Sequence, residues 1–187
     1  AAANMPPGYF GTESIPEVYA RRRANRGFEA VALEGNKLYA FIQSGIDNPD
    51  LTNDNTSRNS NFLRILEFDI STETVTGEFI YPIFERQFTC DKIGDAVALG
   101  NRRFMVLERD DATGPNARKY LFELHLTGAT NIFTNPPNLP GGITVENATY
   151  DQLVAAGVRP AFKRKAVHLP SIGYGQSDKP EIGRAHV

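Results

Sequence analysis

The stretch Phe28-Glu29-Ala30-Val31-Ala32-Leu33 returns later in the chain as Gly94-Asp95-Ala96-Val97-Ala98-Leu99. In both copies an acidic residue is followed by Ala-Val-Ala-Leu, then by a turn that contains Gly-Asn, and then by a second apolar run. Self-similarity of this length and order is typical of repeat architectures, in which each copy is one supersecondary unit. The sequence therefore predicts two copies of the same β-rich unit.

Each copy is followed by further strand patterns. After the first copy, residues 62–70 and 75–81 flank the polar turn 71–74, which is a hairpin pattern. After the second copy, residues 119–126 alternate in the same way, and residues 163–169 are expected to form the outermost strand. Repeating groups of four short antiparallel strands are typical of β-propeller blades, whereas the strands of a sandwich do not normally repeat an internal sequence. We therefore predict an all-β fold, a partial β-propeller of about two four-stranded blades plus the start of a third.

The repeat also sets the expected boundaries within a single propeller domain over residues 1–181. Blade one is expected over about residues 26–83, blade two over about residues 91–170, and the third blade from about residue 178. The Pro/Gly-rich segment before residue 160 is interpreted as an insertion with a short helix near residues 148–157.

The two ends of the chain suggest a fragment of a longer protein. The chain begins in a Gly/Pro-rich stretch without an initiator Met, so a signal peptide would lie upstream. The last seven residues, Glu181 to Val187, match the translation of a common sequencing-library adapter. We therefore expect residues 182–187 to be non-native read-through and exclude His186 as a candidate ligand.

Composition excludes several classes of function. A formal net charge of −2 and a pI near 6.0 give no electrostatic reason to expect nucleic acid or an anionic membrane as partner. Cys90 is the single cysteine, so no internal disulfide can form. The sequence contains no apolar run long enough to span a bilayer. It also has no Walker loop or Gly-x-Gly-x-x-Gly motif, so no organic cofactor is expected.

Polar residues are predicted to gather on one rim of the propeller. The first strand of a blade lines the channel and its neighbour runs antiparallel, so the start of strand one and the end of strand two share a rim. Glu29 and Asp95 open the first strands, while Gln43-Ser44 and Glu108-Arg109 close the second strands. The long Asp/Asn-rich loop 45–61 leaves the same rim, and loops of this size are often functional.

Two interpretations of the acidic pair remain open. Glu29 and Asp95 could face the channel and help to hold a hard cation, Ca²⁺ being the most suitable for oxygen ligands. Alternatively, each carboxylate accepts main-chain N–H groups or pairs with a nearby guanidinium, for which Arg26 and Arg109 are placed. The loop 45–61 lacks the ligand spacing of an EF-hand.

Several motifs in order resemble the phytase-like esterase family, whose domain is described as "esterase-like activity of phytase". The resemblance covers about residues 20–181. Near its end, Asp178-Lys179-Pro180-Glu181 resembles the approach to a third blade. The other matching segments are residues 25–33, 43–44, 63–69, 77–82, 92–99, 104–110 and 173–174.

The resemblance implies a secreted or periplasmic protein that hydrolyses a phosphate or carboxylic ester at the channel mouth, near a Ca²⁺ site. It adds Glu181 to Glu29 and Asp95 as a metal ligand, and it suggests that arginines contact phosphate oxygens. The substrate-binding residues implied at this rim are Arg26, Gln43, Ser44, Arg58, Arg64, Glu108 and Arg109.

The catalytic residues stay unassigned at this stage. Ester hydrolysis through a covalent intermediate needs an activated nucleophile, and no Gly-x-Ser-x-Gly elbow is present. The alternative is a non-catalytic propeller that binds a ligand or a protein on the same rim. The isolated fragment is expected to be inactive, since its outer blades lack neighbours.

Overall fold

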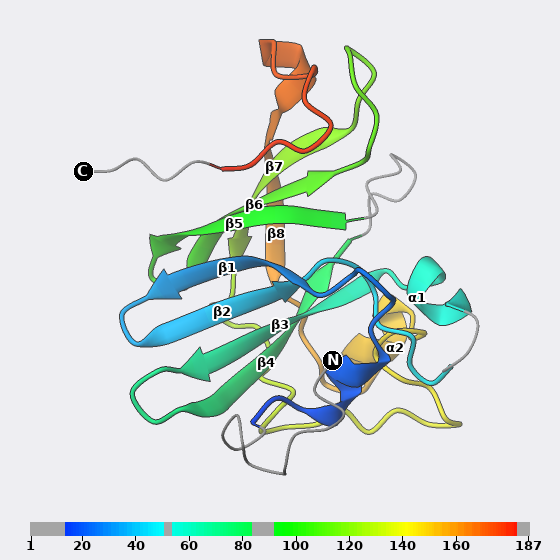
Figure 1. Cartoon of the computed structure of the whole chain (residues 1–187). Coiled ribbons are helices and arrows are strands. Elements are labelled where there is room, and N and C mark those ends of the chain that lie inside the picture. The colour runs from blue at the N-terminus through cyan, green and yellow to red at the C-terminus, as the bar shows by residue number, and fades with distance from the viewer. Residues whose placement is uncertain (1–13, 51–53, 84–91, 183–187) are drawn as a thin grey trace, which may run out of the picture.

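The computed structural model describes residues 14–50, 54–83 and 92–182 and contains two four-stranded antiparallel sheets (Figure 1). In each sheet the strands lie in chain order, so every strand pairs with the one that precedes it in sequence. The prediction of an all-β fold with two four-stranded, propeller-like blades is confirmed. Blade one consists of β1 (Phe28–Glu34), β2 (Lys37–Ile42), β3 (Phe62–Asp69) and β4 (Thr74–Pro82), and blade two of β5 (Lys92–Gly100), β6 (Arg103–Arg109), β7 (Lys119–His125) and β8 (Phe162–His168).

The helices of the described residues are short. The predicted helix of the insertion is present as α2, and its N-terminus is a capping box in which Thr149 and Gln152 bond each other's main chain. None of these helices is long and apolar enough to cross a membrane. They are η1 (Glu17–Arg21), α1 (Asn55–Asn59), α2 (Tyr150–Ala155) and η3 (Leu169–Ile172).

The repeated Ala-Val-Ala-Leu strand forms the contact between the blades. Ala30 and Ala32 of β1 are 2% and 1% exposed, because alternate residues of a strand face the same side and this side faces blade two. The small side chains let β1 and β5 lie side by side (Figure 1). A main-chain hydrogen bond of 2.9 Å from Ile93 to the carbonyl of Gln43 joins the blades at the rim.

Aromatic rings fill the space between the blades beyond these alanines. Phe104 of β6 packs edge-on against Tyr39 and Phe41 of β2, with ring centroids 4.7 and 5.7 Å apart. All three rings belong to one continuous buried cluster. Such edge-to-face pairs stabilise a core beyond the area that they bury.

Both copies of the repeat begin with a β-bulge. The pairing register shifts between Phe28 and Ala30 in β1, and between Ile93 and Asp95 in β5. A bulge inserts an unpaired residue and re-aims the neighbouring side chains. The unpaired residue is the acidic Glu29 itself in β1, and in β5 it is Gly94, directly before Asp95.

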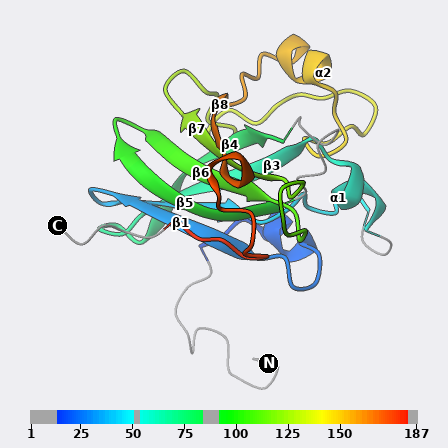
Figure 2. The ribbon, with the colours of Figure 1, turned by 90° about the horizontal axis from the view of Figure 1, so that it is seen from above.

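The insertion between β7 and β8 crosses to blade one. Main-chain N–H groups of Ile132 and Ala161 donate to the carbonyls of Glu78 and Ile80 in β4, at 2.8 and 2.9 Å. A second apolar cluster, including Phe62, Ile80 and Leu153, joins the insertion to this edge. In both views α2 lies to one side of the strands (Figures 1 and 2).

Residues 178–182 contain no strand. The predicted third blade and the domain boundaries therefore stay predictions. The terminal segment instead runs over the rim of blade two, where Gly114 donates a 2.7 Å hydrogen bond to the carbonyl of Gly175.

Replacing the central ring of the blade contact is expected to destabilise the fold. Phe104→Ala should lower the free energy of unfolding by about 3–5 kcal/mol, because it removes a fully buried ring from a packed interface. Phe133→Ala, at a ring that is 44% exposed, should change it by less than about 0.5 kcal/mol. Urea unfolding followed by circular dichroism measures both, and equal losses would contradict the blade contact described here.

Candidate functional site: a cation row at the rim of blade two

Three cationic residues lie in register across three strands at one rim of blade two. Lys92 of β5 is opposite Arg109 of β6, which is opposite Lys119 of β7. They are 4%, 7% and 0% exposed. Like charges directly opposite one another destabilise a sheet, so this cation row requires compensating partners.

The loop after β6 and the segment around Asp178 supply those partners. The carboxylate of Asp111 bridges two cations: Oδ2 accepts from Lys92 Nζ at 2.5 Å, and Oδ1 accepts from Arg109 at 2.8 Å. Asp110 accepts from Lys119 Nζ through its main-chain carbonyl at 3.3 Å and pairs with it through Oδ1 at 3.4 Å. The main-chain carbonyl of Asp178 accepts from both Arg109 and Lys119 at 3.3 Å.

Asp111 differs from the cations in its exposure. Its side chain is 68% exposed, although it contacts two cations that are almost fully buried. The hydrogen bond from Lys92 lowers the pKa of Asp111, the charge of Lys92 and the contact with Arg109 add to this, and partial burial opposes it. A solvent-facing carboxylate therefore covers a buried positive site.

The acidic pair of the repeat has two different environments. Glu29 is exposed, whereas Asp95 is half-buried and accepts two main-chain hydrogen bonds. Its Oδ1 accepts from Ala96 at 2.8 Å, and its Oδ2 accepts from Ile182 at 2.7 Å. The second bond comes from the main chain of Ile182, the residue after Glu181. The metal-ligand roles predicted for Glu29, Asp95 and Glu181 stay predictions. For Asp95, this geometry matches the interpretation in which the carboxylate fixes main-chain N–H groups.

Over residues 14–50, 54–83 and 92–182, no group of three or more His, Cys, Asp or Glu side chains is arranged to hold a metal ion. Ca²⁺ takes six to eight oxygen ligands, and both oxygens of Asp95 already accept main-chain hydrogen bonds. These residues alone do not fit a Ca²⁺ ion. The Ca²⁺ site stays a prediction.

Arg64, which was expected to contact phosphate, is instead buried between two carboxylates. Its guanidinium donates to Glu146 at 2.6 Å and to Glu78 at 3.0 Å, and all three side chains are nearly inaccessible. Burial alone would lower the pKa of Arg64, but the charges of Glu146 and Glu78 outweigh it and raise the pKa. Arg64 therefore ties the insertion to blade one, and we leave it out of the site.

Glu108 is also held in the protein interior. It is fully buried between the blades, where its Oε1 accepts from the Tyr81 hydroxyl and from Lys163 Nζ, both at 2.5 Å. Gln43 and Ser44 are buried as well, and the main chain of Gln43 bonds Gly27 and Ile93.

The two other predicted arginines lie elsewhere on blade one. Arg26 is half-buried in the turn before β1, and Arg58 is exposed on α1, 3.4 Å from Asp54. Arg109 is thus the predicted substrate-binding residue that the structure places in the cation row.

A model for phytase-like proteins, described as "esterase-like activity of phytase", matches residues 4–181. The chain belongs to the phytase-like family. No curated protein and no solved structure matches it. Fold and family do not assign the chemistry of a site, so the function must be argued from the cation row.

Sequence reasoning missed two of the three cations in this phytase-like chain. Lys92 is the first residue of β5 and Lys119 the first residue of β7, and both lie at the rim where β6 ends with Arg109. The antiparallel order of the strands implies this alignment. The first and last residues of these three strands therefore contained the information needed to predict the cation row.

The Asp111 contacts predict an acid-dependent contribution to stability. A carboxyl group whose pKa is lower in the folded than in the unfolded state stabilises the fold at pH values above its unfolded pKa. That stabilisation is lost as the pH falls through the folded pKa. The phytase-like chain should therefore be more stable than its Asp111→Asn variant at pH 7. The difference should shrink below about pH 4, near the ordinary pKa of Asp. Chemical unfolding at several pH values measures it, and a difference that stays constant down to pH 2 would contradict the bridge.

Proposed function

We propose that this chain carries the anion-binding rim of a phytase-like esterase, and that its substrate is a phosphate ester. The observation that supports the proposal is the cation row, in which three buried cations in register are covered by an exposed carboxylate. Membership of the phytase-like family supports the same substrate class. A secreted or periplasmic location, implied by the resemblance, belongs to the same proposal.

The row suits the recognition of phosphate. Lys and Arg form charge-assisted hydrogen bonds with phosphate oxygens, and these are shorter and stronger than neutral ones. Arg109 offers a planar guanidinium that can bind two oxygens at once, while the two lysines act as point charges. Cations that are fixed before the substrate arrives also stabilise the charge that develops on phosphate oxygens during hydrolysis.

Asp111 occupies the place of the substrate in this proposal. Its two oxygens bridge Lys92 and Arg109 as two oxygens of a phosphate would. Because its side chain faces solvent, it can leave with little loss of packing. A phosphate ester then exchanges with it, and the cations keep an anionic partner throughout.

A non-catalytic binding module is the second candidate. In the part of the chain that the structure describes, the contacts that define the row join cations to carboxylates and to the main-chain carbonyls of Asp110 and Asp178. These groups bind anions, but they are not activated nucleophiles. The same rim would then hold a phosphorylated ligand without cleaving it.

Three variants test the anion site, using the protein with any further blades that its gene encodes. Arg109→Gln should weaken the binding of inorganic phosphate by about tenfold or more, the loss expected for a charge-assisted contact. Arg103→Gln, on the same strand but at its other end, should leave binding unchanged. Asp111→Asn should strengthen phosphate binding at neutral pH, because it removes the competing carboxylate. Isothermal titration calorimetry measures all three.

The direction of the change in phosphate affinity in Asp111→Asn distinguishes a role in binding from a purely structural role, since general damage to the rim cannot raise the affinity. Unchanged affinity in Arg109→Gln, or weaker binding in Asp111→Asn, would contradict the proposal. Release of product from phytate, p-nitrophenyl phosphate and p-nitrophenyl acetate, with Ca²⁺ and with chelator, then separates the two candidates. Phosphate binding without turnover in any condition favours the binding module.

A further inference from the structure

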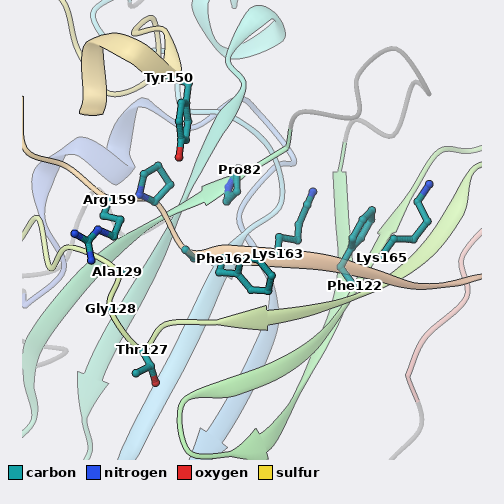
Figure 3. Close-up of a pocket in the computed structure, with 12 residues that line it drawn as sticks. Pro82, Phe122, Thr127, Gly128, Ala129, Tyr150, Arg159, Phe162, Lys163 and Lys165 are labelled. Carbon is teal, nitrogen blue, oxygen red and sulfur yellow. The ribbon is translucent and has the colours of Figure 1, made fainter. Parts of the chain in front are cut away.

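A groove of about 630 Å³ lies between the end of β4, α2 and the start of β8 (Figure 3). This volume is in the range of sites that hold small organic ligands. The lining residues come from blade one, blade two and the insertion, and all of them belong to the described residues. The groove and the cation row have no residue in common.

Two exposed aromatic rings line this groove. Phe162 at the start of β8 is 59% exposed, and Tyr150 at the start of α2 is 48% exposed. Figure 3 shows the hydroxyl end of Tyr150 directed toward the groove. The ring of Phe162 is held edge-on by His125, with centroids 5.4 Å apart. Exposed apolar surface within a groove is typical of a binding site.

The charge of the groove is positive. Its lining includes Arg159, Lys163 and Lys165 and no acidic residue, in a chain whose formal net charge is −2. Lys163 is bound to Glu108, and its Nζ lies 4.1 Å from the centroid of the Phe122 ring. Lys165 lies over the ring of Tyr120.

Among the lining cations, Arg159 has the side chain that is not held by a ring or a carboxylate of the described residues. Its main chain is fixed by two 2.8 Å hydrogen bonds with Thr130, one donated by the N–H of Arg159 and one accepted by its carbonyl. The residue is exposed, and among the residues that the structure describes its guanidinium forms no hydrogen bond or ion pair. A fixed main chain that carries an uncommitted guanidinium reduces the entropic cost of binding an anion.

We propose that this groove binds an aromatic carboxylate. The aromatic ring of the ligand packs against Phe162 and Tyr150, and its carboxylate accepts hydrogen bonds from the guanidinium of Arg159. Offset or edge-to-face contacts favour an aromatic body over an aliphatic one, and the planar guanidinium matches a carboxylate in two-point contact. This site is independent of the phosphate ester proposed for the rim.

The probe is 2-naphthoate, whose fluorescence reports binding. Two analogues test the contributions of the rings and of the charge one at a time. 2-Naphthamide keeps the rings without the charge, and octanoate keeps the charge without the rings. Both should bind at least about fivefold more weakly than 2-naphthoate. Equal binding of either analogue would overturn the proposal, as would no detectable binding of 2-naphthoate.

Arg159→Gln should weaken 2-naphthoate binding by about tenfold, as expected for a charge-assisted contact, and Phe162→Ala should weaken it several-fold. Both side chains are exposed, so neither change should affect folding. The matched control is Arg164→Gln, since Arg164 lies on β8 with Phe162 and pairs with Glu123 outside the groove. Equal losses in Arg164→Gln and Arg159→Gln would overturn the proposal.

The Arg109→Gln variant and added inorganic phosphate test whether the groove and the cation row are separate sites. Neither should change 2-naphthoate binding, whether or not phosphate binds at the rim. Weaker 2-naphthoate binding in Arg109→Gln, or competition by phosphate that this variant abolishes, would place the probe at the cation row and overturn the assignment to the groove.

Discussion

The close approach of β1 and β5 is the constraint on which the rest of the structure depends. Ala30 and Ala32 face the neighbouring blade with side chains small enough for the strands to lie side by side. Larger side chains at these positions would push β1 and β5 apart. They would also disrupt the aromatic contact around Phe104. The same approach aligns the rims of the two blades, where Ile93 bonds Gln43. The contact between β1 and β5 therefore sets how the rim of blade one meets the rim that carries the candidate site.

The buried charged residues of this chain have two different roles. Arg64 with Glu146, and Glu108 with Lys163, join segments far apart in sequence, and each pair is enclosed by protein. Such pairs contribute little net stability, yet removing one partner is costly because the other stays buried without compensation. The cation row differs because Asp111, which bridges two of its members, faces solvent. Of these three groups of buried charge, the row is therefore the one whose carboxylate can exchange with an external anion.

The repeat and the strand alternation were enough to predict both blades, the hairpins and the short helix of the insertion. They could not predict which charged residues are buried. Arg64 and Glu146 are separated by 82 positions, and no local pattern indicates that they meet. Arg109 was predicted from its place at the end of a strand. Lys92 and Lys119 did not stand out because β5 begins three residues before Asp95, at Lys92, and because Lys119 belongs to a third strand, β7.

A crystal structure of the protein with inorganic phosphate tests the central claim most directly, namely that the cation row is an anion site covered by an exchangeable carboxylate. The account predicts one phosphate in contact with Lys92 and Arg109, with the Asp111 side chain turned away into solvent. Phosphate bound elsewhere, while Asp111 still bridges the two cations, would contradict it.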